Sequence, residues 1–157
     1  LNRKLLGSAW IFDRLDDHHI SEVVSSMEVE VFSPGEVIIE FNQAPDRIFI
    51  LISGQVSLLL PRRKHVNKIN VLDTLSKGEV FGELAMVMKT RSPYEARALS
   101  YCEMYSFHIT DFQQLFPDRS HVKQKMDYKA EVRLHQFDGI LELQQGRWVD
   151  ALTLKRP

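Results

Sequence analysis

The sequence predicts an α+β protein that is mainly β, in which an antiparallel sandwich or barrel is flanked by helices at both ends. Apolar residues recur at helical spacing before Met27 and again after His108. Between these two points, short runs of β-branched and aromatic residues are separated by turns that contain glycine. Because short runs of this composition are typical of strands, the middle of the chain is predicted as sheet.

The first helix is predicted to begin at Asp16 or Asp17, because an aspartate can cap the free N–H groups of a first turn. The apolar residues that follow are spaced by three and four, which places them on one helix face. They are Ile20, Val23, Val24 and Met27.

The strands are predicted from runs with alternating or continuous apolar residues. They cover 28–31, 37–39, 47–52, 55–60, 69–72 and 102–107. The turns between them contain Gly35, Gly54 and Gly78. The polar and basic stretch 61–68 is predicted as an exposed hairpin loop. We prefer this to a nucleic-acid contact, because no aromatic residues alternate with its basic ones.

Two further helices are predicted after His108. A short one is capped by Thr110 or Asp111 and stopped by Pro117. A longer one follows, and Gly139 is expected to end it. Its apolar face comprises Val122, Met126, Ala130, Leu134 and Phe137. The pattern leaves open whether Ile140 to Leu143 form a strand or continue the helix.

Composition excludes several classes of protein. Hydrophobic residues make up 44 % of the chain, enough for a packed core, so a disordered chain is excluded. The net charge of −1 argues against a strongly basic nucleic-acid-binding domain. The single cysteine, Cys102, excludes an internal disulfide and fits a reducing compartment. Because the sequence opens on Leu1 and not on methionine, we expect it to be one piece of a longer protein.

The residues do not predict an enzyme or a metal site. The six histidines form no H-x-H or H-E-x-x-H pattern, and the sequence has no C-x-x-C pair. Cys102 lies in a predicted strand beside Tyr101, and we interpret it as a core residue. No serine is surrounded by a glycine-rich elbow.

The segment from Gly78 to Met86 carries the clearest chemical signal. Gly82 allows the backbone to approach a ligand closely. The free N–H groups of Glu83, Leu84 and Ala85 would open a helix and could point to an anion. The alternative is an ordinary strand-to-helix turn in which Glu83 is an acid near a helix N-terminus.

Phe81-Gly82-Glu83-Leu84-Ala85 resembles the phosphate-binding cassette of cyclic-nucleotide-binding domains. The resemblance runs from about Asn2 to Phe137 and is strongest to hyperpolarisation-activated, cyclic-nucleotide-gated channels. Residues 30–39 resemble their first hairpin, and 97–102 resemble the strand after the cassette, in a form also seen in ether-à-go-go-type potassium channels.

The resemblance implies an eight-stranded, jelly-roll-like β-roll with flanking helices. Residues 1–14 would end a C-linker-like segment, 15–137 would form the binding domain, and 138–157 a C-terminal extension. The implied function is regulatory and not enzymatic. Binding of cAMP or cGMP, with cAMP favoured, would be coupled to the gating of a channel-like membrane protein. This domain would be cytoplasmic, the full-length protein a homotetramer, and nucleic acid not a partner.

The implied ligand contacts come from the cassette and from the last helix. Glu83 would meet the ribose 2′-hydroxyl, and counting from Cys102 places Arg133, Leu134 and Phe137 where the channels carry purine-capping residues. The candidate site residues are Phe81, Gly82, Glu83, Leu84, Ala85, Arg91, Ser92, Arg133 and Phe137. The ordinary alternative for Arg133 is exposure to solvent or pairing with an acid such as Glu131.

The cassette departs from the family pattern at its end. Ser92 stands where nucleotide-binding members carry an arginine, Arg91 comes one position early, and Pro93 and Tyr94 follow. We therefore expect weak binding that favours cAMP, since Pro93 has no hydroxyl for a guanine amino group. The alternative is a domain of the same fold that binds no nucleotide. Its pocket would be empty or self-filled, with Ile140–Leu143 as a candidate plug.

Overall fold

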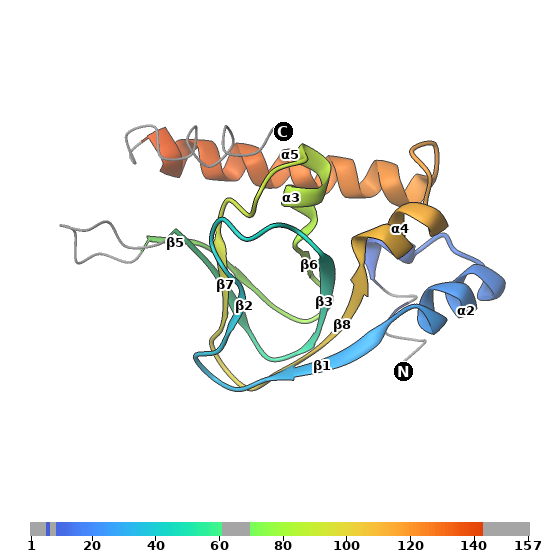
Figure 1. The fold of residues 1–157 in the computed structure, drawn as a ribbon, viewed down its shortest axis with the longest axis horizontal. Helices are drawn as coiled ribbons and strands as arrows, with labels where there is room; N and C mark the ends of the chain where they lie inside the picture. The colour runs from blue at the N-terminus through green and yellow to red at the C-terminus, as the bar shows by residue number, and fades with distance from the viewer. Residues whose placement is uncertain (1–5, 7–8, 61–69, 143–157) are drawn as a thin grey trace.

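The structure is a computed structural model that describes residues 6, 9–60 and 70–142 (Figure 1). Its N-terminal part contains the 3₁₀ turn η1 (Trp10–Phe12) and helix α2 (Asp17–Ser25). The strands are β1 (Glu28–Phe32), β2 (Val37–Ile39), β3 (Arg47–Ser53), β4 (Val56–Leu60), β5 (Asn70–Leu75), β6 (Val80–Phe81), β7 (Glu95–Ala98) and β8 (Cys102–His108). The other helices are α3 (Glu83–Met88), α4 (Ile109–Leu115) and α5 (His121–Glu142).

The strands form two antiparallel sheets of four, ordered β1-β8-β3-β6 and β2-β7-β4-β5. The sheets face each other as a roll, and α5 lies across one end of it next to α3 (Figure 1). This arrangement confirms the predicted mainly-β fold with eight antiparallel strands and helices at both ends. The division into 1–14, 15–137 and 138–157 stays a prediction.

Local sequence patterns located most of the elements. Helix α2 begins after Asp16, whose carboxylate accepts a hydrogen bond from the His19 N–H at 2.9 Å. The strands predicted from apolar runs correspond to β1, β2, β3, β4, β5 and β8. Periodicity missed β6, because it has only two residues, and β7, because its four residues include no β-branched or aromatic side chain. The loop predicted at 61–68 lies outside the described residues.

Two predicted helix ends are wrong. His108, and not Thr110 or Asp111, is the residue before α4, and its side chain makes no capping hydrogen bond. Helix α5 runs past Gly139 to Glu142, because one glycine in a helix costs only about 1 kcal/mol. Of the candidate plug, residues 140–142 therefore continue α5, and Leu143 lies outside the described residues.

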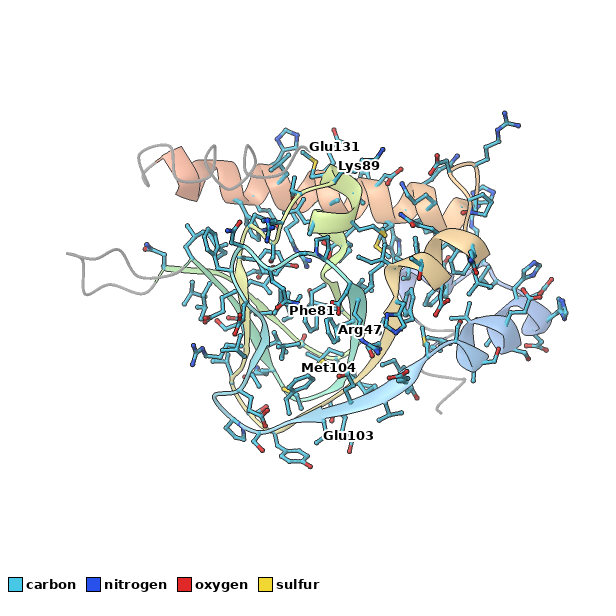
Figure 2. All side chains as sticks on the ribbon, in the orientation of Figure 1. Arg47, Phe81, Lys89, Glu103, Met104 and Glu131 are labelled. Carbon is cyan, nitrogen blue, oxygen red and sulfur yellow. The ribbon has the colours of Figure 1, made fainter. Side chains whose placement is uncertain are left out.

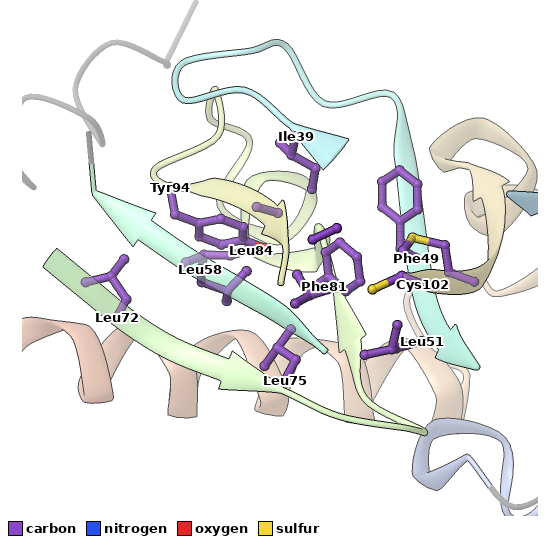
Figure 3. Packing of buried hydrophobic residues seen from close by; sticks show 14 of the residues in the cluster. Ile39, Phe49, Leu51, Leu58, Leu72, Leu75, Phe81, Leu84, Tyr94 and Cys102 are labelled. Carbon is purple, nitrogen blue, oxygen red and sulfur yellow. The ribbon is translucent and has the colours of Figure 1, made fainter. Parts of the chain in front are cut away.

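The buried apolar residues form two clusters. One fills the roll, where Phe49 and Phe81 stack at 5.1 Å between ring centroids (Figure 3). Cys102 belongs to this cluster, is fully buried and donates its thiol hydrogen to the Gln55 carbonyl, which confirms it as a core residue. The other cluster joins the outer face of the β1-β8-β3-β6 sheet to the N-terminal segment, α2, α4 and the start of α5, and includes Tyr105.

Within 6, 9–60 and 70–142, no helix has the length and apolar character needed to cross a membrane. The same residues contain no group of three or more His, Cys, Asp or Glu side chains that could hold a metal ion.

Candidate functional site

Gly82 joins β6 to α3 in a left-handed backbone conformation, with φ of 87°. A Cβ atom added at this position would lie 3.0 Å from the Arg47 carbonyl oxygen of the neighbouring strand β3. The position therefore needs glycine for two reasons, its backbone angle and its close approach to another strand. This brings the N-terminal end of α3 against β3 at the end of the roll that α5 covers.

Replacing Gly82 with alanine is expected to destabilise the fold more than replacing Gly35. Both have a φ near +88°, but a Cβ at Gly35 meets no atom within 4 Å. Left-handed backbone costs each alanine about 1–2 kcal/mol, and the clash should add about 1–3 kcal/mol at Gly82. Urea unfolding of the two variants measures the difference. Equal losses would show that the approach of β3 does not constrain the cassette.

Glu83 forms a buried ion pair with Arg133 of α5. The side chain of Glu83 is fully buried and that of Arg133 is 3 % exposed. Glu83 Oε1 lies 2.5 Å from Arg133 Nη1, which also donates to the Val80 carbonyl at 3.2 Å. Burial alone would lower the pKa of Arg133, but the facing Glu83 carboxylate and weaker contributions from other nearby acidic groups together outweigh it, and the net shift is upward. The guanidinium therefore stays charged.

This pair bears on the ordinary alternative for Arg133, which was exposure to solvent or pairing with an acid such as Glu131. The exposed arginine, or one paired with Glu131, is not what the structure contains. Glu131 is exposed on the outer side of α5 (Figure 2). Arg133 instead reaches the cassette, where it pairs with Glu83. The second Glu83 oxygen, Oε2, is buried and has no hydrogen-bond partner among the described residues.

Tyr94 lies directly against the cassette. It is 1 % exposed, and its ring points into the roll toward Leu84 (Figure 3). Its hydroxyl accepts a hydrogen bond from the Gly82 N–H at 2.8 Å. Its ring meets Phe137 edge to face, with centroids 6.1 Å apart. Burial, and then the nearby Glu83 carboxylate, raise the pKa of Tyr94, so the hydroxyl stays neutral.

The loop before Tyr94 places no cation at the cassette. Ser92 is buried, and its hydroxyl donates to the Tyr94 carbonyl at 2.7 Å. Arg91 is exposed and donates to the Asn42 carbonyl at 3.1 Å. Arg91 has therefore not replaced the missing arginine.

One cavity that borders the cassette is small. A cavity of about 10 Å³ is lined by Gly82, Ala85 and Ser92, among others. That volume is at the lower limit of about 10–15 Å³ needed for one water molecule. A ring or a phosphate would have to displace side chains of the protein to enter this cavity.

The structure thus brings Gly82, Glu83, Arg133 and Phe137 together, and leaves Arg91 outside. Phe81, Leu84 and Ala85 are buried beneath them, and Ser92 supports the loop. The role of these residues as nucleotide contacts stays a prediction. Sequence reasoning did not include Tyr94 among the site residues. Its only signal was a bulky aromatic residue where the family pattern has a small one.

A sequence model described as the cyclic nucleotide-binding domain matches residues 29–119, which is more than half of the chain. The chain belongs to this family. Curated relatives of this cyclic nucleotide-binding domain include potassium/sodium hyperpolarization-activated cyclic nucleotide-gated channel 2 of Mus musculus. It is 26 % identical over 132 residues, which cover 84 % of this chain and 14 % of the channel. Channel 4 of Oryctolagus cuniculus is also 26 % identical, over 84 % of this chain and 11 % of the channel. The chain thus spans only a small part of these relatives.

Solved structures share the fold of this cyclic nucleotide-binding domain. The regulatory domain of Toxoplasma gondii PKA with cAMP has a TM-score of 0.73 at 20 % identity, covering 82 % of this chain and 48 % of that one. The regulatory subunit of a cAMP-independent protein kinase A from Trypanosoma cruzi, bound to guanosine, has a TM-score of 0.74 at 17 % identity. That match covers 92 % of this chain and 49 % of the other. The proteins compared here are channels and regulatory subunits or domains.

Proposed function

We propose that this cyclic nucleotide-binding domain is a regulatory module of a channel-like membrane protein, and that its own side chains close the cassette in place of a nucleotide. The observation that carries the proposal is the hydrogen bond from the Gly82 N–H to the buried Tyr94 hydroxyl, at 2.8 Å. The domain would then act as a gating or interaction element without requiring a ligand.

Competition at Gly82 is the first reason to expect weak nucleotide binding. A ligand that used the Gly82 N–H would have to break its bond to Tyr94 and move a fully buried ring away from Phe137. Packed interiors resist such movement, because the displaced ring needs new space and new contacts. The Tyr94 side chain therefore occupies the position beside the Gly82 N–H that a ligand would need.

Charge is the second reason. A phosphate needs a cation, yet Ser92 is neutral and Arg91 is bonded to the Asn42 carbonyl. The charge of Arg133 is already compensated by Glu83 at 2.5 Å. Losing a charged partner in a buried contact costs about 2–5 kcal/mol, or roughly 30- to several-thousand-fold in affinity.

The channel context is inferred from the relatives. Their names describe cyclic nucleotide-gated channels, and this chain aligns with 14 % of the Mus musculus protein. We infer a cytoplasmic domain of a larger membrane protein, homotetrameric at full length. A regulatory subunit described as cAMP-independent has this fold, so the fold does not by itself require cAMP.

Residual binding of cAMP is the second candidate function, and one observation favours it. Glu83 Oε2 is buried with no partner among the described residues, and a ribose hydroxyl could donate to it. We expect such binding to favour cAMP over cGMP, because Pro93 offers no hydroxyl to a guanine amino group.

Calorimetric titration of cAMP and cGMP into the purified chain tests the proposal. We expect a dissociation constant weaker than about 100 μM for both. Measurable binding with a dissociation constant larger than about 100 μM, and with cAMP bound more tightly than cGMP, would support residual cAMP binding in a mostly closed site. Saturable binding tighter than about 100 μM would overturn the proposal, since Tyr94 could not then be an effective competitor.

A further inference from the structure

A second cavity lies outside the roll, beside the N-terminal turn, α2, α4 and the start of α5. It has a volume of about 270 Å³ and shares no lining residue with the Glu83, Arg133 and Tyr94 site. In Figure 1, α2 and α4 lie at one end of the molecule, to one side of the roll. The cavity therefore needs an explanation separate from the cassette.

The walls of this cavity are apolar. They are formed by Ile11, Leu15, Leu115, Phe116 and Val122. Ile11, Phe116 and Val122 are buried, while Leu15 and Leu115 are half-buried. Such walls suit a hydrocarbon chain, because moving each methylene group from water into an apolar cavity lowers the free energy of the complex.

The remaining lining side chains include four basic ones and no acidic one. They are Arg14, His19, His121 and Lys125. Lys125 is paired with Asp13, and His19 with Asp16, outside the lining. Arg14 is exposed and takes part in no ion pair among the described residues. Arg14 is thus a cation available at the rim of an apolar cavity.

We propose that this cavity binds a free single-chain amphiphile with an anionic head, of the medium-chain carboxylate class. At about 30 Å³ for each water-sized group, a cavity of about 270 Å³ holds about nine such groups. Octanoate, with ten non-hydrogen atoms, is close to that limit. Its chain contacts the apolar walls, and its carboxylate meets Arg14 at the rim.

Calorimetric titration with octanoate is the primary test. We expect saturable binding with a dissociation constant on the order of 0.1–1 mM for a ligand of this size. 1-Octanol should bind at least about five-fold more weakly, because it lacks the charge, and acetate should not bind because it lacks the chain. Absence of saturable octanoate binding would overturn the proposal, as would equal affinity for octanol.

Trp10 supplies a local readout. Its ring lies 5.4 Å from Lys125 Nζ, so it is next to the cavity. The chain has two tryptophans, and Trp148→Phe leaves Trp10 as the sole indole reporter. Octanoate should change the Trp10 fluorescence along the same saturation curve that calorimetry gives. Binding without that change would place the ligand elsewhere and contradict the proposal.

Charge reversal at the rim gives a matched pair of variants. Arg14→Glu should weaken octanoate binding about five-fold and leave octanol unaffected. Arg119→Glu makes the same change of charge at an exposed position outside the cavity and should have no effect. Equal losses in the two variants would show that octanoate responds only to net charge. Binding of anionic phosphatidylserine vesicles in place of octanoate would point to a membrane surface and also overturn the proposal.

Discussion

Replacing Ser92 with arginine and Tyr94 with alanine together is expected to raise the affinity for cAMP by at least about 100-fold. Alanine removes the ring beside the cassette and frees the Gly82 N–H. Arginine supplies a planar fork of donors that can hold two phosphate oxygens at once. Calorimetric titration of the double variant with cAMP measures the gain.

Two comparison variants identify the cause of that gain. Ser92→Lys with Tyr94→Ala should recover less affinity, because an ammonium group lacks the two-point geometry of a guanidinium. Arg91→Ala should leave the affinity unchanged, because Arg91 is bonded to the Asn42 carbonyl outside the cassette.

The cost in stability needs its own measurement. Removing a buried aromatic ring typically costs about 3–5 kcal/mol, so the double variant should unfold at lower urea and be stabilised by added cAMP. A folded double variant that binds cAMP no better than the original chain would show that the loop holding residue 92 does not receive the phosphate.

Replacing Arg133 with methionine is expected to lower the free energy of unfolding by about 3–5 kcal/mol. The change leaves the fully buried Glu83 carboxylate without its partner at 2.5 Å. It also removes the bond to the Val80 carbonyl, which helps to attach α5 to the roll. Urea unfolding followed by circular dichroism measures the loss.

A rescue variant and a surface control complete this test. Glu83→Gln combined with Arg133→Met should recover more than half of the loss, because no uncompensated charge is then buried. Lys123→Met removes ion pairs with Asp127 and Asp118, whose side chains are 45 % and 97 % exposed, and should cost less than about 1 kcal/mol because both carboxylates remain in contact with water. If the Arg133 and Lys123 variants lost equal stability, the buried pair would not be what holds α5 on the cassette.

The way α5 meets the cassette shows how local signals and tertiary contacts differ. The spacing of Val122, Met126, Ala130, Leu134 and Phe137 predicted one apolar face; Leu134 is half-buried in the structure and the other four are buried. The same spacing placed Arg133 on the polar flank, where an arginine is usually exposed. It is buried because the flank meets Glu83, and a helical period carries no information on what will face it.

The sequence by itself determined the fold class, most of the elements and the position of the cassette. The fold class and the elements follow from the repeat of apolar residues and from glycines at turns, which act over a few neighbouring residues. The position of the cassette follows from the resemblance of residues 81–85 to the family motif. Only the tertiary structure decided which polar groups of the cassette are paired with one another. The Glu83–Arg133 pair joins residues 50 positions apart, and the Gly82–Tyr94 bond joins residues 12 apart. Such contacts depend on how the roll and α5 pack together, because packing selects which polar groups become partners once water is excluded.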